Sequence, residues 1–422
     1  MTPVVAAVPT RATAVRQKVV ALTFCLSLVL FLDRAALSVL APSIRRDLHI
    51  GPAAMGAVFT AFVWGYALLN IPAGALGDRY GARRVLTAIV LLWSLFTAAT
   101  AAAWSLLSLL AVRFLFGAAE AGATPNVSQS YARWIPVVER ARAQGFFLAG
   151  MSAGSALAPP LVTLGLMRWG WRATFLGLGF LGVAWAAGWF YWYRDDPRRH
   201  SGVNAGELEL LRDRAVSTAV VDIRWGRVLA TPNLWAILLM YFTYGYTGYI
   251  YITWFPSYLM ESRHLPLNVA GTLAAAPGIF GLFAKPLGGW ISDRLTARYG
   301  LRVGRCSVGM CGFGLAALAI VPGLFVSSPY LSAVILAAGD GSAALAHGVC
   351  FAVCIDTGFQ RAGTVAAMML TMGSIGNAVS ALAFGSFLQF TGSWTAPFLL
   401  GMAANALGAL LWLKIHPEKR II

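Results

Sequence analysis

Charged residues are scarce in this sequence: Asp, Glu, Lys and Arg together make up 11% of its 422 residues. Soluble globular domains carry about 25%. The shortage excludes a water-soluble enzyme or binding domain, because 59% of the residues are hydrophobic and the mean hydropathy is +0.70. Apolar runs of about 20 residues recur along the whole chain, and an α-helix needs that length to cross a bilayer. The sequence therefore predicts an integral membrane protein.

Acidic residues are especially few, 16 against 32 Lys and Arg, so the net charge is +16. If the N-terminal tail, every second loop and the C-terminus lie on one side, roughly 24 of the 32 basic residues gather there, about five lie on the other side and about three lie within helices. Basic loops of this kind face the cytoplasm and anionic lipid, so the charge needs no nucleic-acid partner. We expect a multi-pass monomer in the lipid bilayer of the cell (inner) membrane, with both termini cytoplasmic and no nucleic acid bound.

Cysteine is rare and odd in number. The cysteines lie in or next to apolar runs and have no ligand partners at zinc-site spacing. We therefore predict no disulfide, no metal and no cofactor. Buried small apolar side chains are expected at all five positions, Cys25, Cys306, Cys311, Cys350 and Cys354.

Twelve apolar runs can be counted, in two sets of six. The first is longer than a signal-peptide core and lacks a cleavage site, so we expect it to be retained. The expected helices are 19–43, 53–76, 84–103, 105–130, 141–167, 172–193, 231–260, 266–292, 303–325, 328–355, 362–390 and 393–415. Between the sets, mixed charge suits a solvated linker with a short amphipathic helix. The expected parts are a cytoplasmic tail (1–18), an N-terminal six-helix bundle (19–193), a cytoplasmic linker (194–230), a C-terminal six-helix bundle (231–415) and a cytoplasmic tail (416–422).

Four charged residues lie inside expected membrane helices. Arg113 and Glu120 are seven residues apart, close to two helical turns, so they project from one face. Asp33 and Arg34 lie about four turns into the first helix and point about 100° apart, so each can meet a different neighbour. Charge at this depth is costly unless it is paired or faces a wet cavity. We predict that these side chains line a cavity; the alternative is a static pair that ties the first helix to the fourth.

A loop motif recurs at matching places in the two sets. GALGDRYGARR at 74–84 and GGWISDRLTARYGLR at 288–302 each place an Asp-Arg pair after helix-end glycines. The first resembles the G-x-L-x-D-R-x-G loop of the major facilitator superfamily. The resemblance implies an all-α integral membrane fold of twelve transmembrane helices in two pseudo-symmetric six-helix bundles. It also implies a conformational latch, in which the aspartate pairs with the opposing half, at Asp78, Arg79, Asp293 and Arg294.

The stretch GAAEAGATPNVSQSYARWIPVVERARAQG at 117–145 resembles the signature of the anion:cation symporter family within that superfamily. FLDRAALSVLAP at 31–42, FVWGYALLNIPAG at 62–74 and TWFPSYL at 253–259 are similar to the same family. That family contains sugar-acid and organic-anion transporters and their sialin-like relatives. The resemblance implies a secondary active transporter, not an enzyme, that imports a small organic anion with protons by alternating access.

The residue types agree with this interpretation. A guanidinium stays protonated and grips a carboxylate with two parallel hydrogen bonds, so Arg34 is the expected anion-binding residue. Asp33 and Glu120 are the expected proton carriers, with Arg113 holding one of them ionised in one state. The resemblance implies the same roles. Further substrate contacts are expected at Tyr66, Asn377, Tyr244 and Ser152, with Tyr249 as another hydroxyl; each could instead make a helix-to-helix hydrogen bond.

Three polar residues leave alternatives open. Asp340 and His347 share a helix face and could be a second proton relay, a substrate contact or a satisfied polar pair. Lys285 could extend to the membrane interface or provide a second cation for a dicarboxylate. Where sugar-acid members carry a glutamine in the fifth helix, this chain has only Ser152 and Ser155, which weakens the case for a polyhydroxy acid. The substrate could be a sugar acid, an aromatic acid or a dicarboxylate. A proton-coupled efflux pump of the same fold, for an organic acid or drug, is the alternative function.

Overall fold

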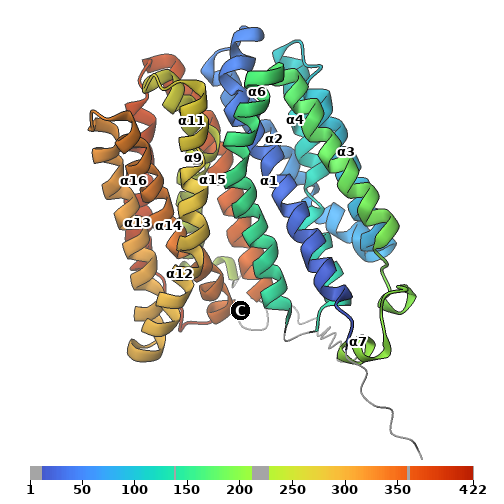
Figure 1. Cartoon of the computed structure of the whole chain (residues 1–422). Helices are drawn as coiled ribbons and strands as arrows, with labels where there is room; N and C mark the ends of the chain where they lie inside the picture. Colours follow the sequence, from blue (N-terminus) through green and yellow to red (C-terminus); the bar gives the residue numbers. More distant parts are fainter. Residues whose placement is uncertain (1–11, 137–138, 212–227, 359–361, 422) are drawn as a thin grey trace, which may run out of the picture.

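The computed structural model describes residues 12–136, 139–211, 228–358 and 362–421, and this part of the chain forms helices and no strands (Figure 1). The first half comprises α1 (Val15–Asp47), α2 (Pro52–Tyr80), α3 (Ala82–Thr100), α4 (Leu106–Glu120), α5 (Ala123–Trp134) and α6 (Arg140–Trp192). A short connection holds η2 (Pro197–Arg199) and α7 (Ala205–Leu210). The second half comprises α9 (Pro232–Thr253), α10 (Phe255–Ser257), η3 (Tyr258–Ser262), α11 (Leu267–Leu273), α12 (Ala276–Tyr299), α13 (Leu301–Phe325), α14 (Pro329–Gly358), α15 (Ala362–Thr391) and α16 (Thr395–Trp412).

The predicted twelve-helix fold is confirmed. Within the described residues, 10 helical segments are long and apolar enough to cross a membrane. One of them, Ala143–Trp192, contains two crossings, because Gly170 at φ 75° and ψ 171° turns the chain between them. A positive φ of this size is open to glycine and strained for other residues. The remaining crossing is α9, a 22-residue helix.

Large apolar side chains cover the outer surface of the bundle. Leu107, Phe180 and Phe390 are each at least three-quarters exposed. In a bilayer these faces meet lipid tails, which are as apolar as the helix core. The expectation of five buried cysteines is corrected: Cys350 and Cys354 are buried, Cys306 is half-buried, and Cys25 and Cys311 are exposed, all as free thiols. In a bilayer an apolar side chain need not be buried within the protein.

The two halves lie side by side in Figure 1, with the N-terminal half in blue to green and the C-terminal half in yellow to red. Several contacts join the two halves at the end of the bundle away from the termini, where α1 ends and α2 begins. There Arg45 Nη1 lies 2.9 Å from Glu261 Oε1, and the Phe59 ring meets Trp254 edge-on at 5.6 Å. Gln389 Oε1 accepts from the Ala53 amide at 3.1 Å. These contacts close the molecule on that side.

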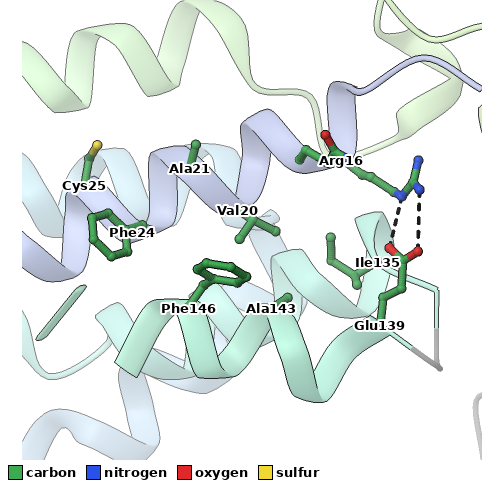
Figure 2. Close-up of a pocket in the computed structure, with 10 residues that line it drawn as sticks. Arg16, Val20, Ala21, Phe24, Cys25, Ile135, Glu139, Ala143 and Phe146 are labelled. Carbon is green, nitrogen blue, oxygen red and sulfur yellow. Dashed lines mark hydrogen bonds and ion pairs between the residues drawn. The ribbon is translucent and has the colours of Figure 1, made fainter. Parts of the chain in front are cut away.

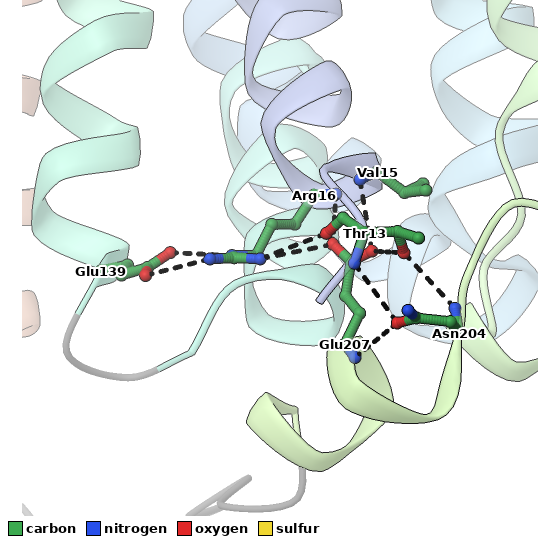
Figure 3. Close-up of polar contacts among 6 residues, drawn as sticks. All are labelled: Thr13, Val15, Arg16, Glu139, Asn204 and Glu207. Carbon is green, nitrogen blue, oxygen red and sulfur yellow. Dashed lines mark hydrogen bonds and ion pairs between the residues drawn. The ribbon is translucent and has the colours of Figure 1, made fainter. Parts of the chain in front are cut away.

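At the end of the bundle near the termini, the segment that contains α7 forms hydrogen bonds with the start of α1 (Figure 3). Glu207 is fully buried and accepts from the amides of Arg16 at 2.9 Å and Val15 at 3.3 Å, and from the Thr13 hydroxyl. Ala14, the residue before α1, has no capping side chain of its own. Glu207 therefore caps the helix from a distance and places negative charge at its positive end.

Arg16 extends this network to the start of α6. Its guanidinium lies 3.1 Å from Glu139 and 3.5 Å from Glu207. The Arg16–Glu139 pair lies at one end of a largely apolar pocket of about 560 Å³ between α1 and α6, in which Val20, Phe24 and Phe146 are prominent (Figure 2). None of the predicted substrate or proton-coupling residues lines this pocket.

Helices α2 and α4 approach at backbone distance, and glycine makes this possible. A Cβ at Gly65 would lie 2.0 Å from the Phe114 carbonyl oxygen, and one at Gly117 would lie 2.1 Å from that of Phe62. Small residues at such crossings let membrane helices pack closely. The crossing brings the α2 aromatic residues against the charged face of α4.

We expect Gly117→Ala to destabilise the purified protein by about 1–3 kcal/mol, because the new methyl group overpacks the crossing. Thermal unfolding in detergent measures this. Gly188→Ala is the matched control, since its Cβ meets nothing within 4 Å and alanine favours the helix. Equal melting temperatures for the two variants would contradict the interpretation of the crossing.

Candidate functional site

The structure brings together the four charged residues singled out in the sequence. α1 contributes Asp33 and Arg34, and α4 contributes Arg113 and Glu120. Asp33, Arg113 and Glu120 are 1–2% exposed, whereas the side chain of Arg34 is 23% exposed. Of the four, only Arg34 is accessible enough to meet a ligand directly.

Arg34 is held by one ion pair and three aromatic rings. Its Nε and Nη2 both contact Oε1 of Glu120. Its Cζ lies 5.2, 5.1 and 4.9 Å from the ring centroids of Phe31, Phe62 and Tyr66. A guanidinium within about 6 Å of a ring face is attracted to it. The predicted substrate residue Tyr66 is thus part of the wall around Arg34.

Arg113 does not form the ion pair with Glu120 that the shared helix face suggests. Its Cζ lies 4.2 Å from the Phe116 ring centroid, and its Nε and Nη1 have no hydrogen-bond partner in the described residues. Glu120 Oε2 is unpartnered in the same sense. Both Glu120 and Asp33 lie within electrostatic range of Arg113. A buried polar atom without a partner costs about 1–3 kcal/mol, so this cluster is poised to exchange partners.

Asp33 points away from Arg34, as their 100° offset predicts. It lies beside Trp93 and Thr97 of α3, and both of its carboxylate oxygens lack a geometrically good hydrogen bond. Trp93 Nε1 and Thr97 Oγ1 also lack one among the described residues. These two neighbours could not be predicted from the sequence, because a Trp and a Thr one turn apart on an apolar helix carry no functional signal.

Tyr249 of α9 connects the opposing half to this cluster. It is 9% exposed and lies within electrostatic range of Arg34, Arg113 and Glu120. The charged cluster is therefore built on the N-terminal half and covered by the C-terminal half.

The other predicted substrate contacts are engaged in protein contacts here. The Tyr244 hydroxyl lies 3.0 Å from Nδ1 of His347. The Asn377 side chain is oriented so that its amide nitrogen donates to the carbonyl oxygens of Gly245 at 2.9 Å and Gly373 at 3.2 Å. His347 thus pairs with Tyr244 in this conformation. The roles of Asp340 and His347 as a proton relay or a substrate contact stay predictions.

The loop motif of the second half forms an ion-pair network within that half. Arg305 of α13 lies 2.6 Å from Asp293 and 3.1 Å from Asp356. Arg294 lies over the Trp290 ring at 5.5 Å, and Arg79 lies over Tyr80 at 5.2 Å. The side chain of Asp78 lies outside the described residues. The latch across the halves stays a prediction for another conformation.

The sequence profile of the Major Facilitator Superfamily matches residues 23–381. The chain belongs to the Major Facilitator Superfamily. It is therefore a multi-pass membrane transporter and not an enzyme.

Relatives of the chain carry transporter names. A protein named "Probable sulfoacetate transporter SauU" from Cupriavidus necator is 32% identical over 393 residues, which cover 92% of this chain and 91% of that protein. The "Hexuronate transporter" of Bacillus subtilis is 29% identical and covers 92% of both chains. A solved bacterial homologue of the human lysosomal transporter Spinster, inward-facing and unoccupied, superposes with a TM-score of 0.73 at 20% identity, covering 94% of this chain and 95% of that one. The structural likeness shows the shared fold.

Proposed function

We propose that this protein is a secondary active transporter that imports a small organic anion together with protons by alternating access. The observation that carries the proposal is Arg34: a guanidinium inside the membrane, partly accessible, framed by three rings and paired with a buried glutamate. The relatives support an anionic substrate, since their names specify sulfoacetate, hexuronate and galactarate or glucarate. Sugar acids, aromatic acids and dicarboxylates remain within the proposed class.

The mechanism follows from partner exchange at Arg34. An incoming carboxylate or sulfonate occupies the guanidinium and displaces Glu120. A displaced carboxylate in a buried site must meet another cation or accept a proton, because an uncompensated buried charge is costly. Arg113 and Asp33 are the adjacent groups between which charge and proton can be redistributed. Anion binding and proton binding are thereby linked.

The distribution of basic residues supports an orientation in the inner membrane with both termini in the cytoplasm. In the proposed cycle, the two six-helix bundles (19–193 and 231–415) rock about the site. The contacts of Arg45 with Glu261 and of Phe59 with Trp254 then lie on the outer side. In this orientation we infer an inward-facing conformation, in which Arg34 pairs with Glu120.

Uptake into proteoliposomes tests the coupling. We expect an imposed inward proton gradient to drive accumulation of a labelled organic anion above equilibrium, since each coupled proton supplies about 1.4 kcal/mol per pH unit. A protonophore should abolish the accumulation. Uptake that ignores the gradient would contradict symport, and loss of labelled acid from expressing cells would favour the efflux pump. A thermal-shift screen with sugar, aromatic and dicarboxylic acids narrows the substrate.

A further inference from the structure

We propose that the substrate is a dianion and that Lys285 binds its second anionic group, across the site from Arg34. The inference rests on the proposed anion transport and names its substrate class. Its basis is the position and the unsatisfied charge of Lys285.

Lys285 lies in the interior of α12, more than two turns from either end. A snorkelling lysine extends along its helix toward the interface. Instead, Nζ of Lys285 donates to Oγ of Ser152 on α6, in the opposite half, at 3.2 Å. The two helices pack closely at Gly278, where an added Cβ would lie only 2.8 Å from the Ala156 backbone nitrogen. The ammonium group therefore sits between the halves.

The charge of Lys285 is not neutralised by a close ion pair. The acid in electrostatic range is Asp340 of α14, and the two form no ion pair within 4.0 Å in the described residues. An ammonium group has three donors, of which Ser152 takes one. The Ser152 hydroxyl accepts that bond and keeps its own proton to donate. Lys285 and Ser152 together can thus hold a carboxylate or sulfonate.

Contacts of α9 connect this pair to Arg34. Lys285 lies within electrostatic range of Asp340 and His347 on α14, and Nδ1 of His347 lies 3.0 Å from the Tyr244 hydroxyl of α9. Tyr249, five residues farther along α9, lies within electrostatic range of Arg34. Arg34 and Lys285 therefore both lie near one segment of α9, and they come from opposite halves.

Two cations on opposite halves select a ligand with two anionic groups. A dianion would contact Arg34 through one group and Lys285 through the other, and so bind both halves at once. A monoanion would leave the Lys285 ammonium without an anionic partner, and it would contact one half only. The dianion therefore favours closure of the two halves over the site, whereas the monoanion does not. A ligand shifts the equilibrium between the open and closed conformations only if it binds one of them more tightly.

The test measures binding of matched acids to the purified full chain by thermal shift and calorimetry. The pairs are succinate and butyrate, phthalate and benzoate, and 3-sulfopropionate and propionate. We expect the wild type to bind at least one dianion about tenfold or more tightly than its monoanion. Lys285→Met should weaken that dianion about 10- to 100-fold and leave the monoanion unchanged, whereas Lys285→Arg should retain the preference.

Three outcomes would overturn the inference: no dianion binding by the wild type, equal losses for both members of a pair, or no loss in Lys285→Met. Ser152→Ala is the matched control, since it removes the hydroxyl and keeps the charge, and it should weaken dianion binding less than Lys285→Met. Arg34→Gln separates the two proposals. If it leaves all binding intact, the proposed function itself is wrong; if it abolishes binding while Lys285→Met has no effect, only the dianion inference is lost.

Discussion

Arg34→Gln is expected to reduce uptake of the organic anion by about 100-fold or more. Glutamine keeps much of the length but lacks the charge and the forked donors that grip an anionic group. Arg34→Lys should recover only a small part of the activity, because an ammonium makes a point contact rather than a bidentate one. Initial uptake rates in proteoliposomes, normalised to reconstituted protein, provide the measurement.

Two controls separate recognition from folding. Arg34→Gln alone leaves Glu120 buried without its partner, and breaking a buried pair costs about 3–5 kcal/mol. The double variant Arg34→Gln/Glu120→Gln removes both charges, so it should regain thermal stability but not uptake. Arg46→Gln, at the exposed end of the same helix, should behave as wild type. Normal uptake by the double variant would contradict the role of Arg34.

Glu120→Gln is expected to abolish accumulation against a gradient while sparing exchange of labelled for unlabelled anion. The amide keeps the shape of the side chain, yet it can neither carry a proton nor compete as an anion for Arg34. Uphill uptake should fall to equilibration, and its dependence on the imposed proton gradient should disappear. Counterflow at equal pH on both sides measures the exchange that remains.

Asp33→Asn is expected to give the same uncoupled behaviour, because Asp33 is the other buried carboxyl beside Arg113. Glu418→Gln, a charge-removing change on the exposed C-terminal segment, should retain full accumulation. If both membrane variants still concentrate the anion, Asp33 and Glu120 are not on the proton path. If both lose exchange as well, their role lies in the fold or in substrate binding rather than in coupling.

The helical fold was open to prediction because its signals are local. Hydropathy over about 20 residues locates a crossing without knowledge of any neighbour. The motif at 74–84 and its counterpart at 288–302 indicated that the six-helix unit occurs twice. The seven-residue spacing of Arg113 and Glu120, and the offset of Asp33 from Arg34, gave their directions on each helix.

The pairing of these groups depended on the tertiary structure. How far one helix is rotated and displaced against the next is set by contacts between segments distant in sequence, such as the crossing at Gly65 and Gly117. Only that arrangement decided that Glu120 pairs with Arg34 and not with Arg113. It also directed Lys285 across the interface to Ser152. The sequence alone determined which charges enter the membrane, because composition and helical period are carried by each segment; the packing of the helices determined which of those charges meet.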